Sequence, residues 1–292
     1  MKKLYLLVAL AGIDTGCQQQ APPTRAGVGT KVEAVAPVAK AVVPEQPLPT
    51  LFTAADTLTA PMRELLRQYD LSSLWRSDVE YRREHPTLDG FFGPDHYRFS
   101  VVFSEVKRDE QRSDIYHIRG KYRYRKNIRP FTGILTVRQI KDLPRGYFFL
   151  AGAGSELPDT AAAHTYTSLA QVQLTEENRE NSGIFEGEAI LDFYIVPAPA
   201  KIGYVTGITE IESDMPARGA GLLLRGKRRN LTTKQVKSFV VASDVFAAAP
   251  DIYKDFGIGD RGHEINPKYA KLGWNELWEN DEWWADAPTA QL

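Results

Sequence analysis

The feature that most constrains the fold of this chain is a series of nine short segments, rich in β-branched and aromatic residues, between residues 97 and 242. Clusters of Gly, Pro, Asn, Asp or Ser separate the segments, as turns separate strands. The sequence between them has no helical pattern, which argues against the strand–helix–strand units of a parallel sheet. The predicted strands are Tyr97–Val106, Asp114–Arg123, Pro130–Ile140, Tyr147–Ala151, Tyr166–Leu174, Gly183–Val196, Gly203–Ile211, Gly219–Arg228 and Val236–Ala242.

Closing such a sheet into a ring removes its exposed edges. We therefore expect a mainly β fold, an antiparallel up-and-down barrel of about eight or nine strands, with a two-sheet sandwich as the alternative. A short N-terminal helix is predicted over Thr59–Tyr69, where Pro61 stands near the start and apolar residues recur at helical spacing. A second short helix is predicted near the C-terminus from the spacing of Trp274, Leu277 and Trp278.

The N-terminus predicts export from the cytosol. Met1-Lys2-Lys3 precedes an apolar stretch, Leu4–Ile13, that is much shorter than the about 20 residues of a membrane-spanning helix. Cys17, the single cysteine of the chain, follows in Ile13-Asp14-Thr15-Gly16-Cys17. This arrangement resembles the signal of bacterial lipoproteins, although Asp14 stands where that family usually has an aliphatic residue.

The resemblance implies a signal peptide over residues 1–16 and a lipid on Cys17 that holds the protein to a bilayer. Ala9-Leu10-Ala11 offers a competing cleavage site that would leave a free thiol. Residues 17–58 are rich in Ala, Pro and Val and predict a disordered tether, followed by one β-rich domain over 59–292. We expect a membrane-anchored protein of the cell envelope, facing the periplasm or the surface, with no cofactor because ATP and NAD(P)H pools are absent there.

Two segments of the body, Gly90–Tyr97 and Pro130–Gly133, are similar to uncharacterised bacterial secreted barrel proteins of lipocalin-like architecture. That resemblance implies a barrel but no activity and no site residues.

Charge is locally uneven in the predicted barrel. The whole chain has a formal net charge of −1, which predicts no nucleic-acid partner, but Lys107–Arg145 holds twelve Lys or Arg against four Asp or Glu. Strand alternation places Arg119, Lys121 and Arg123 on one face of their strand, and Tyr122 and Tyr124 on the other.

This pattern predicts capture of a small amphipathic or anionic ligand by the barrel. The predicted ligand-binding residues are Arg119, Lys121, Tyr122, Arg123, Tyr124, Arg225 and Lys227. A cavity of a few hundred Å³ is then expected in the barrel interior. In the alternative, the cations lie on the barrel's exterior and pair with Glu186, Glu188 and Asp192 of a neighbouring strand.

The C-terminal segment supports a second function. Four of the five tryptophans, from Trp274 to Trp284, lie within eleven residues beside several carboxylates. Their indoles either pack on the body or form a surface for sugar rings or a partner. The alternative function is therefore an envelope structural or protein-interaction module.

Catalysis is the least favoured function. Asp95, His96, Asp260, His263 and Glu264 are the candidate acid–base groups for a hydrolase, and all lie in predicted loops. The histidines lack metal-ligand spacing, and one cysteine makes no thiolate zinc site. The sequence predicts no metal site and assigns no catalytic residue.

Overall fold

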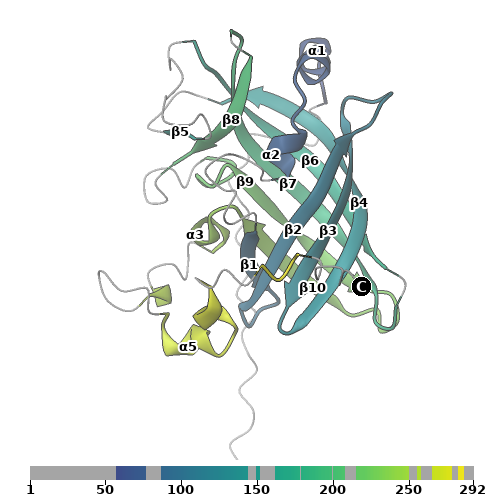
Figure 1. The fold of residues 1–292 in the computed structure, drawn as a ribbon, viewed down its shortest axis with the longest axis vertical. Helices are drawn as coiled ribbons and strands as arrows, with labels where there is room; N and C mark the ends of the chain where they lie inside the picture. The colour runs from purple at the N-terminus through teal and green to yellow at the C-terminus, as the bar shows by residue number, and fades with distance from the viewer. Residues whose placement is uncertain are drawn as a thin grey trace, which may run out of the picture. The chain divides into compact units, whose positions relative to one another are not determined.

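The structure is a computed structural model, and it describes residues 57–76, 87–143, 149–151, 162–177, 179–198, 200–207, 215–249, 255–257, 265–277 and 282–285 (Figure 1). The predicted signal peptide and tether, with Cys17, lie outside the described residues apart from Thr57 and Leu58.

The described strands belong to one antiparallel sheet in the order β5-β8-β7-β6-β4-β3-β2-β1-β10-β9. Pairing of β7 with β9 closes eight of them, all except β5 and β8, into a ring. The closed ring confirms the predicted mainly β, antiparallel barrel. The strands are β1 (Leu88–Phe92), β2 (Tyr97–Arg108), β3 (Ile115–Tyr124), β4 (Asn127–Asp142), β5 (Phe149–Ala151), β6 (His164–Glu176), β7 (Gly183–Val196), β8 (Lys201–Thr206), β9 (Leu222–Asn230) and β10 (Val236–Ala242).

Several strands begin or end a few residues away from the predicted bounds, and β8 covers Lys201–Thr206 where Gly203–Ile211 was predicted. β1 was not predicted, because its five residues are all buried and so lack an inside–outside alternation. β9 begins at Leu222 rather than Gly219, because Gly219 and Gly221 have φ angles of 76° and 81°, which end the preceding turn in the left-handed region.

Aromatic side chains fill the barrel interior. Phe99 and Phe185 stack with their ring centroids 5.7 Å apart, and Phe239 meets Phe185 edge-on at 5.4 Å. The space left beside these rings is about 10 Å³, too small for a ligand. The large central cavity expected for a ligand-binding barrel is therefore not present around these residues.

The two N-terminal helices cover one end of the barrel, at the top of Figure 1. α1 (Ala60–Gln68) and α2 (Ser72–Trp75) bury Leu66, Leu74 and Trp75 completely in the barrel core. The Tyr204 hydroxyl donates a hydrogen bond to the carbonyl of Leu74, and Arg108 donates to the carbonyl of Leu66 at 2.8 Å. The predicted helix over Thr59–Tyr69 is thus present and closes this end.

A second apolar cluster packs on the outside of β1 and β10. It includes α3 (Val245–Ala248), α5 (Pro267–Ala270) and the 3-10 turn η2 (Trp274–Glu276). Trp274 is fully buried there, and its Nε1 donates to the carbonyl of His96 at 2.9 Å. The predicted C-terminal helix is thus a single short turn, and Trp278 lies outside the described residues.

Candidate functional site

The structure places the predicted cations of β3 on the outer face of the barrel. Arg119 is exposed, and its Nε lies 3.7 Å from a carboxylate oxygen of Glu105. Lys121 donates to the carbonyl of Trp284 at 2.8 Å, and the guanidinium of Arg123 lies 5.2 Å from the ring centroid of Trp283. These three side chains therefore do not line the barrel interior.

The two predicted cations of β9 also face outward. Arg225 forms an ion pair with Glu188 of β7 at 2.8 Å, and Lys227 is exposed. Arg229 of β9 lies 3.3 Å from Glu186 of β7. For Arg225, Glu188 and Glu186, the exterior cross-strand pairing considered in the sequence analysis is the observed arrangement.

Asp192 has a different environment. It is completely buried on the outer side of β7, where it accepts hydrogen bonds from the Thr167 hydroxyl at 2.5 Å and the Ala217 backbone N–H at 2.9 Å. Burial raises the pKa of its carboxyl to about 7, although both hydrogen bonds lower it.

A small cavity lies at the barrel end opposite α1 and α2, and we call it the cup. Its volume is about 170 Å³. The residues that line the cup are Phe92, Tyr122, Tyr124, Asn127, Arg129, Asn181, Arg228, Asn230, Gln235 and Lys237. Of the predicted ligand-binding residues, the structure brings only Tyr122 and Tyr124 to it.

A buried carboxylate organises the guanidinium groups of the cup. The side chain of Glu176 is 1% exposed and accepts two hydrogen bonds from Arg228, from Nε at 2.5 Å and Nη2 at 3.0 Å. Arg129 donates a third at 3.3 Å. This fork fixes Arg228 in one orientation. Burial disfavours the charged form of Arg228, but the contacts with Glu176 outweigh it and raise the pKa of Arg228.

Aromatic rings form the apolar wall of the cup. The ammonium of Lys237 lies 5.6 Å from the ring centroid of Phe92 and 5.8 Å from that of Tyr124. Burial, followed by the nearby negative charge of Glu176, raises the pKa of the Tyr122 phenol. Tyr122 therefore stays neutral and its hydroxyl remains a hydrogen-bond donor at neutral pH. The cup thus combines cations with an aromatic edge.

Sequence reasoning missed Arg129, Arg228 and Lys237, although strand alternation contained the signal. Leu224 and Phe239 point into the core, so Arg228, four residues after Leu224, and Lys237, two before Phe239, point inward too. The inward register of Arg129 follows in the same way from the buried Phe131. The cup itself could not be foreseen, because it requires ring closure between distant strands.

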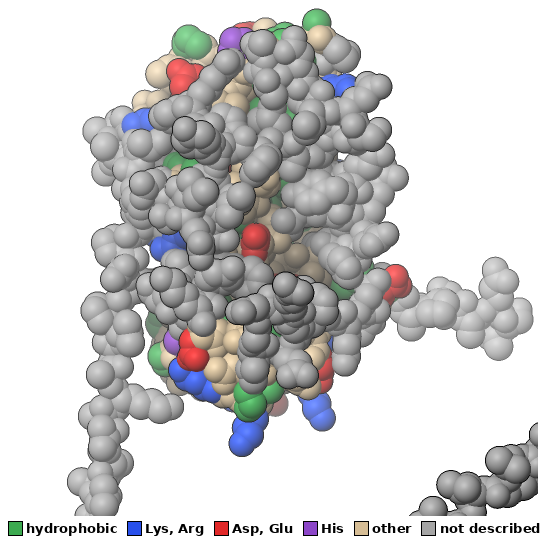
Figure 2. Space-filling view, turned by 90° about the vertical axis from the view of Figure 1, so that its left-hand side faces the viewer, with side chains coloured by type: hydrophobic (Ala, Val, Ile, Leu, Met, Phe, Trp, Pro, Cys, Tyr) green, Lys and Arg blue, Asp and Glu red, His purple; other side chains and the backbone are tan. Residues whose placement is uncertain are grey.

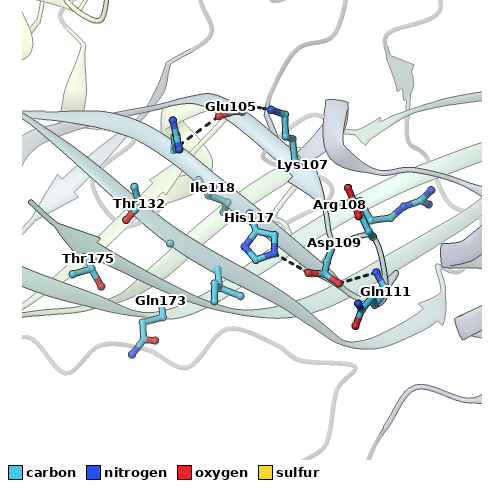
Figure 3. Close-up of a pocket in the computed structure, with 14 residues that line it drawn as sticks. Glu105, Lys107, Arg108, Asp109, Gln111, His117, Ile118, Thr132, Gln173 and Thr175 are labelled. Carbon is cyan, nitrogen blue, oxygen red and sulfur yellow. Dashed lines mark hydrogen bonds and ion pairs between the residues drawn. The ribbon is translucent and has the colours of Figure 1, made fainter.

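A larger recess, of about 910 Å³, lies on the outer face of β2, β3, β4 and β6 (Figure 3). In it, His117 Nε2 lies 2.9 Å from Asp109 Oδ2. Asp109 also accepts hydrogen bonds from the backbone N–H groups of Gln111 and Arg112, so it closes the turn between β2 and β3. The hydrogen bond from His117, the largest cause, lowers the pKa of Asp109. These contacts are those of a turn on an open polar surface.

The candidate acid–base groups are only partly described. Asp260, His263 and Glu264 lie outside the described residues. His96 has a φ of 55° and packs edge-on against Phe91 at 5.2 Å, and burial lowers the pKa of its ring. Its neighbour Asp95 opposes that shift through its charge. The structure therefore gives His96 a packing role in the turn between β1 and β2.

Comparisons of the chain with protein-family models, with curated proteins and with solved structures found no match. Within the described ranges, no cluster of three His, Cys, Asp or Glu side chains has the arrangement of a metal site. The helices of the same described part are too short or too polar to cross a membrane. Function is therefore inferred from the geometry of the cup.

Proposed function

We propose that this protein binds a small ligand with an anionic group, and that the cup is the binding site. One observation carries the proposal: Arg129, Arg228 and Lys237, from three different strands, converge on one cavity, and a single buried carboxylate, Glu176, pairs with the two arginines. The surplus of positive charge in a partly enclosed site favours an anion. A charge-assisted hydrogen bond there contributes about 1.5–3 kcal/mol.

The size of the cup limits what enters it. Its volume of about 170 Å³ equals the space of roughly five or six water molecules, which suits a carboxylate or phosphate group. The filled barrel interior excludes a long acyl chain beneath it. An apolar part of the ligand would instead lie against Phe92 and Tyr124 at the opening, so the expected ligand is amphipathic or anionic.

The proposed location is the cell envelope. The basic start, the short apolar stretch and Cys17 support an exported protein anchored to the bilayer by a lipid. In that location the ligand would be a small molecule of the envelope. Mass spectrometry of the mature N-terminus tests the location, and an unmodified chain that begins at Met1 would contradict it.

The test of binding uses n-octyl phosphate as the probe and isothermal titration calorimetry as the measurement. The full chain carries Cys17→Ser so that no lipid is attached. Lys237→Gln and Arg129→Gln are each expected to weaken binding by about tenfold or more, because each removes a charged donor. Lys227→Gln, on the outer face of β9, is the matched control and should leave the affinity unchanged. Equal affinities in all four proteins would refute the proposal.

The filled barrel interior favours a second candidate function, an envelope structural or protein-interaction module. Trp283 and Trp284 are half-buried on the outer face of β3, and their rings meet edge-on at 5.8 Å. This function predicts no binding of n-octyl phosphate. It also predicts that Trp283→Ala with Trp284→Ala abolishes cross-linking to an envelope protein that the parent chain captures.

A further inference from the structure

Exposed aliphatic side chains surround the opening of the cup. In the part of the chain that the structure describes, four large hydrophobic residues are exposed: Ile128 (43%), Ile134 (43%), Leu231 (39%) and Val236 (53%). Ile128, Leu231 and Val236 directly follow or precede residues that line the cup, namely Asn127, Asn230 and Gln235. Three of the four therefore form a rim around the opening of the cup. We call these three the rim residues, and this end of the barrel the mouth.

The rim residues stand on opposite sides of the barrel. Ile128 lies at the start of β4 and Val236 at the start of β10. In the closed ring, three strands separate β4 from β10 in either direction. Leu231 lies in the turn between β9 and β10. Aliphatic side chains therefore lie on two opposite sides of the opening, with Ile128 on one side and Leu231 and Val236 on the other.

The mouth is positively charged although the chain as a whole is not. The charged side chains at the mouth are those that line the cup, Glu176 beside it, and those in the described parts of the turns β1–β2, β3–β4, β6–β7 and β9–β10. Seven are cationic and four are carboxylates, whereas the chain has a net charge of −1. The cations are Arg125, Lys126, Arg129, Arg179, Arg228, Lys234 and Lys237, and the carboxylates are Asp95, Glu176, Glu177 and Glu180.

The space-filling view agrees with this distribution. Lys and Arg side chains project from the lower end of the face shown in Figure 2, beside hydrophobic and acidic side chains. The helices α1 and α2 occupy the opposite, upper end in Figure 1.

Exposed aliphatic residues around a cationic centre are complementary to the surface of an anionic bilayer, which has charged headgroups above an apolar layer of acyl chains. Aliphatic side chains gain from entering the boundary between headgroups and acyl chains. Basic side chains gain from the negative potential of anionic lipids, and this gain falls with salt. The rim residues supply the aliphatic side chains and the cup supplies the basic ones, at the same end of the barrel.

We propose that the mouth of the barrel docks on an anionic lipid surface, with Ile128, Leu231 and Val236 in the bilayer interface and the phosphate of one headgroup in the cup. This inference rests on the proposed function, because it names a lipid headgroup as the anion that the cup takes. It also gives the rim residues a role that binding of a free small anion does not require.

The test places an environment-sensitive fluorophore on the rim. Because Cys17 is the single cysteine, Cys17→Ser gives a full chain free of cysteine, into which Ile128→Cys or Val236→Cys introduces one labelling site. Ile134→Cys is the matched control, since Ile134 lies on the same strand with the same exposure of 43% but away from the mouth. An NBD label at 128 or 236 should brighten several-fold and shift to the blue on vesicles of phosphatidylcholine with phosphatidylglycerol. The label at 134 should not change.

The controls separate this inference from the proposed function. Phosphatidylcholine vesicles alone, or high salt, should weaken the response at 128 and 236 by about tenfold or more. If the labels do not respond but n-octyl phosphate still binds the cup, docking is wrong and the proposed function stands. If the labels respond and Lys237→Gln changes neither vesicle affinity nor octyl phosphate binding, the headgroup is not in the cup and both proposals are wrong. An equal response at 134, or a response to protein concentration without vesicles, overturns the inference.

Discussion

Replacing Asp192 by Asn is expected to remove a pH-dependent loss of stability. The Asp192 carboxyl is completely buried between β6, β7 and the turn that contains Ala217. Asn keeps both hydrogen bonds, because its carbonyl can accept from the Ala217 N–H and its amide can donate to Thr167. The substitution therefore removes the ionisation of this group with little change in packing.

The size of the effect follows from the pKa of Asp192. Burial raises it from 3.8 to about 7 in the folded chain. At 1.36 kcal/mol per pKa unit, this difference corresponds to about 4 kcal/mol. Below the unfolded pKa, Asp192 is protonated in both states and adds no pH dependence. As the pH rises from about 4 to about 7, the unfolded state releases the proton first, so the wild-type chain loses stability until the folded pKa is passed.

Urea denaturation followed by tryptophan fluorescence measures this effect at several pH values between about 4 and 8. The free energy of unfolding of Asp192→Asn minus that of the wild type should rise by about 4 kcal/mol across this range and then level off. Glu186→Gln, at an exposed carboxylate on the same strand, should change stability by less than about 1 kcal/mol throughout. If the wild type and Asp192→Asn lose stability in parallel, the reasoning about this buried carboxyl is refuted.

Three further predictions concern stability and use the same denaturation assay. Glu176→Gln should lower the free energy of unfolding by about 3 kcal/mol, because it leaves the guanidiniums of Arg129 and Arg228 without their carboxylate. Adding Arg228→Met should recover part of that loss, and an unchanged denaturation midpoint for Glu176→Gln would contradict the prediction. Trp75→Ala should lower the free energy of unfolding by about 3–5 kcal/mol, because it opens a cavity under α2. A loss below about 1 kcal/mol would show that α2 does not pack on the barrel core. A double-mutant cycle on Arg225 and Glu188 should give a coupling below about 1 kcal/mol, and a larger value would mean that this exterior pair is less solvated than its exposure indicates.

The sequence was sufficient to predict the barrel, because alternation is strong where one face is apolar. In β7, Phe185, Leu191 and Phe193 point into the core, and Glu186 and Glu188 face outward. Alternation alone did not decide which face of β3 is the inner one, since Tyr122 and Arg123 belong to two faces that both carry bulky side chains. The buried Tyr116 and Ile118 decide it in the structure.

The cup could not be predicted for a different reason. Alternation with the core residues Phe131 and Phe239 gives the inward direction of Arg129 and Lys237, but it does not tell which strand ends meet in the fold. Their convergence depends on pairing between β7 and β9 and between β1 and β10, which joins residues far apart in the chain. Gly90 in β1 illustrates such a long-range requirement, because a Cβ atom there would lie 2.0 Å from the carbonyl oxygen of Val240.

The helical cover at one end of the barrel imposes an order on biosynthesis. Leu74 and Trp75 are translated early, but Tyr204 of β8, whose hydroxyl donates to the Leu74 carbonyl, is made 130 residues later. Pairing of β1 with β10 also joins the first described strand to the last. Contacts this distant in sequence slow folding. The nascent chain therefore leaves α2 without this partner until β8 has been made, and during this interval a chaperone or protease has access to the helix.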